Sequence, residues 1–159
     1  MSKNKVIKKN FNKLKTFTRG MKQKYVSRVG IIGSGNDNRE DSVMGNAEIG
    51  IVQEFGSATK NIKSRSFLRM PIESKSKQIV KDVVKKKDLI EKSLADGNIK
   101  FLYSLLAVAA EKQVLTAFDT SGFGTWEAIK PRKDGSSTPL RDTDQLMRSI
   151  TSDVERSHG

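Results

Sequence analysis

Apolar side chains at the start of the chain recur at steps of three and four residues, separated mostly by lysines. This step is the period of an amphipathic helix with one apolar face. The pattern therefore predicts a basic amphipathic helix or arm over residues 1–25. Its apolar positions are Ile7, Phe11, Leu14, Phe17 or Thr18, Met21 and Tyr25.

Two segments rich in Val and Ile follow, at residues 25–32 and 47–55. Segments of this length and composition are typical of β-strands. The polar stretch between them contains Gly33, Gly35 and several acidic residues. We therefore predict an antiparallel hairpin with a long, mobile tip.

Most of the second half of the chain is predicted to be helical. Residues 71–94 carry apolar side chains at helical spacing, with Pro71 suited to a first turn and Gly97 to a stop. Residues 99–118 are the most apolar stretch and are expected in the core, with the lysine run 85–87 exposed on the partner helix. A short helix at 144–149 and a strand at 150–154 complete the chain.

These elements predict an α+β fold: an antiparallel sheet packed against two long helices, with an N-terminal basic helix and long loops. The chain has 159 residues, which suits one domain. We assign this domain to residues 26–159, with a long loop near 119–139. Loops of that length are uncommon in compact domains and usually have a function.

Positive charge is concentrated in the arm. Residues 1–28 hold ten Lys and Arg and no acidic residue, and the rest of the chain holds 20 basic and 18 acidic residues. The arm is either a packing helix with a solvated face or a contact for DNA or an acidic partner. The candidate contacts are Lys3, Lys5, Lys8, Lys9, Lys13, Lys15, Arg19, Lys22 and Lys24.

Residues for catalysis are missing. The chain lacks Cys, its one histidine is His158, and Asp142 and Asp144 are better explained as helix caps. The glycines near residue 33 have no Walker lysine, and the acidic residues 37–41 do not have EF-hand spacing. We predict no enzymatic activity, no metal and no cofactor.

Membrane insertion and secretion are not expected either. No apolar run approaches the 18 residues that span a membrane, and no signal-peptide apolar region follows the basic start. The absence of Cys agrees with assembly in a reducing cytoplasm.

Two strings of residues point to a family. Residues 52–57 (VQEFGS) and 62–69 (IKSRSFLR) resemble the E-[FY]-G-T … I-P-A-R-P-F-L-R signature of phage tail-completion and neck proteins. Residues 126–131 (WEAIKP) and 139–150 (PLRDTDQLMRSI) are similar to the ending of virion-morphogenesis proteins related to the G protein of phage Mu. Lys63, Ser64, Ser66 and Asp144 depart from the usual residues, and Asp144 tolerates unusual backbone angles.

The resemblance implies a structural virion protein, a tail-completion or head–tail connector subunit in the tail or neck. It implies a homo-oligomeric ring, a hexamer or a dodecamer, that contacts other tail and connector proteins without a cofactor. A nucleic-acid-binding module acting in phage DNA packaging or assembly is the alternative.

Residues that combine charge with large apolar groups in connecting segments are the candidates for subunit contacts. For Phe67 and Trp126 an internal packing role stays open at this point. The candidates are Glu54, Phe55, Arg65, Phe67, Arg69, Trp126, Leu140 and Leu146.

Overall fold

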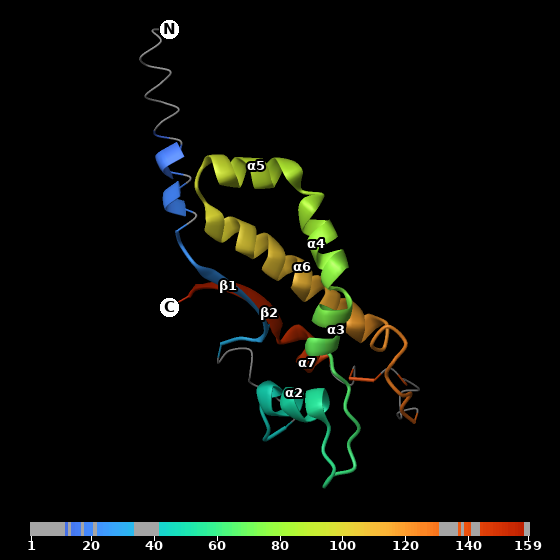
Figure 1. The fold of residues 1–159 in the computed structure, drawn as a ribbon. Coiled ribbons are helices and arrows are strands. Elements are labelled where there is room, and N and C mark those ends of the chain that lie inside the picture. The colour runs from blue at the N-terminus through green and yellow to red at the C-terminus, as the bar shows by residue number, and fades with distance from the viewer. Residues whose placement is uncertain are drawn as a thin grey trace, which may run out of the picture.

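The computed structural model describes residues 12, 14–16, 18–20, 22–33, 42–130, 137, 139–140 and 144–157. The described residues between 12 and 20 are helical and form the N-terminal helix. Figure 1 shows the elements that follow. They are β1 (Tyr25–Ile31), α2 (Asn46–Phe55), α3 (Arg69–Ser74), α4 (Ser76–Val84), α5 (Lys87–Ala95), α6 (Ile99–Asp119), α7 (Gln145–Arg148) and β2 (Ile150–Arg156).

The fold combines helices with a two-stranded antiparallel sheet, as an α+β class requires. β1 pairs with β2 in a register that runs from Tyr25 opposite Arg156 to Ile31 opposite Ile150. α6 packs against both strands and against α4. Ser27 donates a 2.8 Å hydrogen bond to the carbonyl oxygen of Tyr103, which ties the sheet to α6. The strands predicted at 25–32 and 150–154 are confirmed.

The predicted strand at 47–55 is wrong, because this segment is the helix α2. Its buried residues are Asn46, Gly50 and Glu54, a spacing of four that places them on one helix face. Glu48 accepts a 3.2 Å hydrogen bond from the backbone N–H of Gly45 at the helix start. The β-branched residues of the segment suggested a strand, but tertiary packing overrides this weak preference. The predicted hairpin is therefore wrong too, and the partner of β1 comes from the C-terminal end.

The single long helix predicted for 71–94 is also wrong. The chain forms three shorter helices, α3, α4 and α5, with breaks at Lys75 and at residues 85–86. Lys86 has non-helical angles, φ −89° and ψ 45°. Ser74 and Ser76 flank the first break, and serine is a poor residue for a helix interior. Breaking the segment lets Ile79 and Val83 of α4 pack beside Ala109 and Ala110 of α6.

The helix predicted at 99–118 is confirmed as α6. Asn98 caps it by accepting a 3.3 Å hydrogen bond from the N–H of Phe101. The expected exposure of the lysine run 85–87 is confirmed. The main core joins α6 to the C-terminal segment and consists of Phe67, Val114, Ala117, Phe118, Trp126, Leu146 and Ile150.

One helix among the described residues, α6, is long and apolar enough by length and composition to cross a membrane, with a mean hydropathy of 1.3. The expectation that no stretch reaches this length is therefore wrong. The reason is that the mean hydropathy of α6 is high, although the charged residues Lys100, Glu111 and Lys112 interrupt its apolar sequence. A core helix of a soluble protein meets the same criteria, and α6 contributes to both hydrophobic clusters.

Candidate functional site

Glu54 organises the segment in which the first string of motif residues lies. Its side chain is buried, and its carboxylate accepts hydrogen bonds from Ser66 Oγ at 2.6 Å and from the N–H groups of Phe67 at 2.8 Å, Leu68 at 2.9 Å and Arg69 at 3.2 Å. These N–H groups precede or begin α3, where helix geometry leaves donors without partners. Glu54 therefore links the end of α2 to the start of α3.

Gly56 closes the turn after α2. Its φ is 76°, and a Cβ at this position would lie 2.8 Å from the carbonyl oxygen of Ile62 and 2.9 Å from the nitrogen of Ser64. Ser57 and Ile62 exchange two backbone hydrogen bonds of 2.8 Å, so residues 57–62 form a small hairpin. Figure 1 shows this hairpin projecting from the body beyond α2. Only glycine adopts this backbone without strain and without a clash.

Several predicted interface residues are internal. Phe67 is fully buried, and its ring lies 5.2 Å from that of Phe118. Trp126 is 9% exposed and meets Phe118 edge-on at 5.9 Å. Leu146 is buried in the same cluster, and Leu140 packs against it.

The prediction that Glu54, Phe67, Trp126 and Leu146 make subunit contacts is therefore corrected: the fold itself uses them. Burial in the subunit's own core leaves at most 9% of each residue exposed, although Glu54 and Phe67 also line the apolar groove described below. For Phe67 and Trp126 the structure selects the internal role that the sequence left open.

The C-terminal half of the resemblance contains a second correction. Asp144 precedes α7 in the left-handed region, with φ 56°, but its side chain makes no capping hydrogen bond. Its tolerance of unusual angles is thus confirmed, whereas its predicted capping role is wrong. Asp142, His158 and the acidic residues 37–41 lie outside the described residues.

An apolar groove of about 390 Å³ lies between α2, α3 and the end of β1. Ile51 and Phe55 stand four residues apart on α2, on one face, and are 61% and 67% exposed. Their neighbours in the groove include Leu68, Arg69 and Ile72. Of the predicted interface residues, Phe55 and Arg69 are thus exposed at this groove.

Arg65 is half-buried, and its backbone N–H donates a 2.7 Å hydrogen bond to the carbonyl oxygen of Gln53.

Ile51 was missed by sequence reasoning, because residues 47–55 were assigned to a strand. Its spacing of four from Phe55 would have revealed the shared face if the segment had been taken as a helix.

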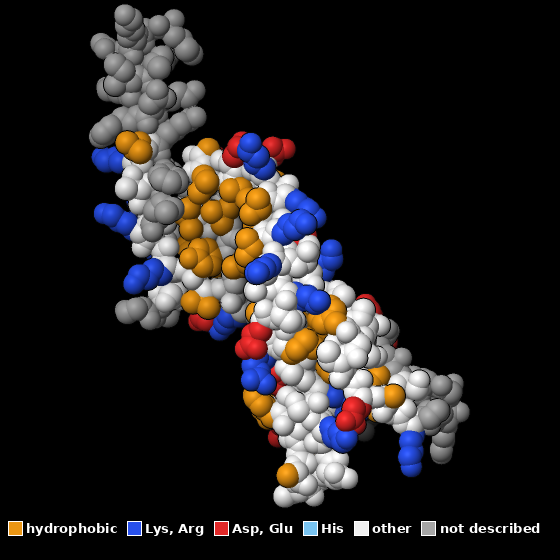
Figure 2. All heavy atoms as spheres, turned by 45° about the vertical axis from the view of Figure 1, so that its right-hand side comes forward, with side chains coloured by type: hydrophobic (Ala, Val, Ile, Leu, Met, Phe, Trp, Pro, Cys, Tyr) orange, Lys and Arg blue, Asp and Glu red, His pale blue; other side chains and the backbone are white. Residues whose placement is uncertain are grey.

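A second apolar surface lies on the helices at the other end of the molecule. Leu89 of α5 and Leu106 of α6 are 43% and 36% exposed. Figure 2 shows hydrophobic side chains gathered where α5 and the first half of α6 lie. We call the exposed apolar side chains of these two helices, Leu89 and Leu106, the α5–α6 face. Figure 1 places it far from α2.

A basic groove runs beside the N-terminal helix. Two hollows of about 720 Å³ and 680 Å³ share the lining residues Arg19, Lys22 and Gln23, so they adjoin, and we call them together the basic groove. Lys15 lines the first hollow and Lys24 and Arg156 line the second. All five cationic side chains are exposed.

The predicted contact residues of the arm fall into two groups. Lys15, Arg19, Lys22 and Lys24 come together at the basic groove, whereas Lys3, Lys5, Lys8, Lys9 and Lys13 lie outside the described residues. Arg156 was missed, because nothing near it in sequence indicates that the end of β2 reaches the arm. Its place opposite Tyr25 in the strand register brings it there.

The N-terminal helix is held to the body by close backbone contact. A Cβ on Gly20 would lie 2.6 Å from the carbonyl oxygen of Gly97, and a Cβ on Gly97 would lie 2.7 Å from Thr16 Cγ2. A side chain at either glycine would therefore force the two segments apart. The N–H of Ser157 also donates a 3.0 Å hydrogen bond to the carbonyl oxygen of Lys24, which joins the end of β2 to the same region.

Charge also pairs across the sheet. Arg28 makes two hydrogen bonds to the Asp153 carboxylate, of 2.8 and 2.6 Å, and an ion pair with Glu155. The hydrogen bond from Arg28 holds the pKa of Asp153 below its usual value, and the bond to Asp153 raises the pKa of Arg28. This exposed cluster connects β1 and β2 but does not lie in either groove.

Within the part of the chain that the structure describes, no group of three or more His, Cys, Asp or Glu residues could hold a metal ion. Comparison of the chain with protein-family models, with curated proteins and with solved structures finds no match. The family resemblance therefore stays a prediction.

Proposed function

We propose that this chain is a structural, non-enzymatic subunit of a bacteriophage tail or neck, which acts in tail completion or as a head–tail connector. It assembles into a ring in the host cytoplasm and stays in the virion, in contact with other tail and connector proteins. One observation carries the proposal: the subunit has two different exposed apolar surfaces, the apolar groove and the α5–α6 face. The occupant proposed for the apolar groove is the α5–α6 face of a second copy.

The positions of these surfaces favour a head-to-tail contact. They lie at opposite ends of the subunit (Figure 1), so one subunit cannot cover its groove with its own α5–α6 face. A contact between two different surfaces repeats from copy to copy, and it closes into a ring when the rotation fits. A contact that used a single self-complementary surface would stop at a dimer.

The internal use of the motif residues also supports the proposal. Glu54 and Gly56 hold α2, the hairpin 57–62 and α3 in one arrangement, which presents Ile51 and Phe55 beside the groove. The first string of family-like residues therefore builds the candidate contact surface. Ring size, hexamer or dodecamer, comes from the resemblance alone.

Assembly of the purified chain tests the proposal. We expect closed oligomers by mass photometry and ring-shaped particles by electron microscopy. Ile51→Glu with Phe55→Glu should weaken association at least about thirtyfold, since anchor residues contribute 2 kcal/mol or more. The double variant Leu89→Glu with Leu106→Glu should weaken association by a similar factor.

Val108→Glu is the matched control. Val108 is 54% exposed and stands two residues from Leu106, on the opposite side of α6. This variant should assemble like the wild type. Wild-type chain that stays monomeric at every concentration contradicts the ring.

Mixing the two defective variants tests whether the apolar groove of one subunit binds the α5–α6 face of another. Each variant keeps one intact surface, so the mixture should form a 1:1 complex of twice the 17.7 kDa subunit mass and nothing larger. A mixture that stays monomeric contradicts pairing of these two surfaces. In intact phage particles, micrographs should place the ring at the tail end or the head–tail junction.

A further inference from the structure

The basic groove brings together parts of the chain that are distant in sequence. Lys15 and Arg19 come from the N-terminal helix, Lys22 and Lys24 from the connection to β1, and Arg156 from the end of β2. Figure 2 shows a line of Lys and Arg side chains along the N-terminal segment. Among the described residues, Arg19, Lys22, Lys24 and Arg156 form no ion pair.

We propose that the basic groove binds the phosphate backbone of DNA without reading its sequence. The inference rests on the charge and shape of this groove and does not depend on ring assembly. It goes beyond a structural role, because it assigns a nucleic-acid contact to five named side chains.

The arrangement of the cations suits a linear polyanion. Lys15 and Arg19 stand four residues apart in the N-terminal helix, which places their side chains on one helix face about 6 Å apart along the axis, and Lys22 follows in the connection to β1. DNA presents phosphates in close succession along each strand, and Lys and Arg bind them with release of counterions. Among the described residues that line the groove, Asp96 is the one acidic residue.

The remaining lining favours phosphate over bases, proteins or lipid. The other described residues that line the groove are Asn12, Thr16, Thr18, Gly20, Gln23, Gly97 and Ser157. They are polar or lack a side chain, so none of the described lining residues offers an aromatic platform for base stacking. A protein partner normally needs an apolar anchor, and a membrane-surface helix inserts apolar residues. Polar side chains and cations are the usual contacts to phosphate oxygens.

The fold holds this groove in shape before any ligand binds. Gly20 and Gly97 bring the N-terminal helix against the turn before α6, and Ser157 fixes the end of β2 to Lys24. A positioned set of cations loses less side-chain freedom on binding than a flexible tail does. Arg156 should therefore contribute as much as the lysines of the arm, although it lies more than 130 residues away in sequence.

Binding of the full-length chain to a double-stranded DNA oligonucleotide, measured by fluorescence anisotropy at several salt concentrations, tests the proposal. The variant carries Arg19→Gln, Lys22→Gln and Arg156→Gln. It should bind at least about tenfold more weakly at about 50 mM salt, and the slope of log K against log salt should fall by about 2.7, or 0.9 for each lost phosphate contact. Unrelated DNA sequences should give the same affinity.

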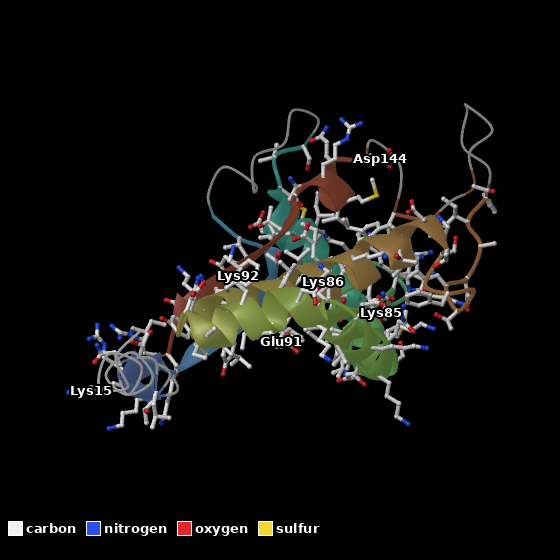
Figure 3. All side chains as sticks on the ribbon, turned by 90° about the horizontal axis from the view of Figure 1, so that it is seen from above. Lys15, Lys85, Lys86, Glu91, Lys92 and Asp144 are labelled. Carbon is white, nitrogen blue, oxygen red and sulfur yellow. The ribbon has the colours of Figure 1, made fainter. Side chains whose placement is uncertain are left out.

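The control variant carries Lys85→Gln, Lys86→Gln and Lys87→Gln, which removes the same charge elsewhere. Figure 3 shows Lys85 and Lys86 well apart from Lys15. This control should keep both the affinity and the salt slope. Equal losses of DNA affinity in the two variants would mean that net charge alone drives binding. That result would contradict binding at the basic groove.

Two further ligands separate the partner classes. Vesicles of phosphatidylcholine with phosphatidylserine present an anionic membrane, and poly-glutamate presents an acidic protein chain. Both should bind more weakly than DNA. Tighter or equal binding to either overturns the assignment to DNA, as does the absence of DNA binding at low salt.

Discussion

The apolar groove at the α2 end and the basic groove beside the N-terminal helix present opposite chemistry and are built differently. At the α2 end, one buried carboxylate, Glu54, arranges the backbone around an apolar groove. At the other end, exposed cations gather in a groove whose shape depends on contact between Gly20 and Gly97. The first end is continuous with the main core, because Phe67 follows directly from the Glu54 contacts. The second end is attached to the body by backbone contact and a few hydrogen bonds.

This difference indicates that different residues determine the folding stability of the domain and its contacts with partners. At the α2 end, changes to buried residues should unfold the domain, and only exposed residues such as Phe55 report on association. At the basic end, changes should alter binding while the core stays folded. Substitutions at the two ends and in the sheet test this division.

Glu54→Ala should lower the free energy of unfolding by at least about 3 kcal/mol, because it leaves three backbone N–H groups near the core without an acceptor. Urea denaturation measures the change. Glu54→Gln should lie between this variant and the wild type, since its amide keeps one acceptor oxygen.

Glu73→Ala removes an exposed carboxylate from α3 and serves as the control, with an effect within about 0.5 kcal/mol. A loss of less than about 1 kcal/mol in Glu54→Ala would contradict the role of Glu54 as the organiser of the α2 end.

Gly20→Ala should release the N-terminal helix while global unfolding changes by less than about 1 kcal/mol, because local opening limits the penalty. A Cβ would lie 2.6 Å from the carbonyl oxygen of Gly97, so the two backbones must separate. Limited proteolysis should then cut near residues 12–20 faster than in the wild type.

Thr18→Ala, a change at an exposed position of the same helix, should leave the cleavage rate unchanged. A large loss of global stability in Gly20→Ala would show instead that the basic end is part of the core.

The smallest effect is expected at the exposed sheet cluster. Because Arg28 lowers the pKa of Asp153 in the folded chain, the stabilisation is present above the unfolded carboxyl pKa of about 3.9 and is lost as the pH falls through the lowered value. Asp153→Asn should therefore melt slightly below the wild type at pH 7, and the difference should vanish at strongly acidic pH. A difference that grows on acidification would contradict this sign.

Sequence reasoning succeeded where the pattern was local and strong. The run of Leu and Ala residues predicted α6, and the Val- and Ile-rich segment predicted β1. It failed for α2, since Ile49, Ile51 and Val52 have side chains that favour strands while burial follows a spacing of four. Of the candidate surfaces, Phe55, Arg69 and four arm cations were predicted, but Ile51 and Arg156 were not.

The sequence by itself determined which chemistry the chain carries: a concentration of positive charge before residue 28, one strongly apolar helix, no cysteine, and the paired strings around Glu54 and Trp126. The tertiary structure alone decided where that chemistry lies. It turned Glu54 and Trp126 inward, left Phe55 outside, and brought Arg156 beside the basic arm. The physical reason is that periodicity reports on one segment at a time, whereas burial depends on which distant segments pack together.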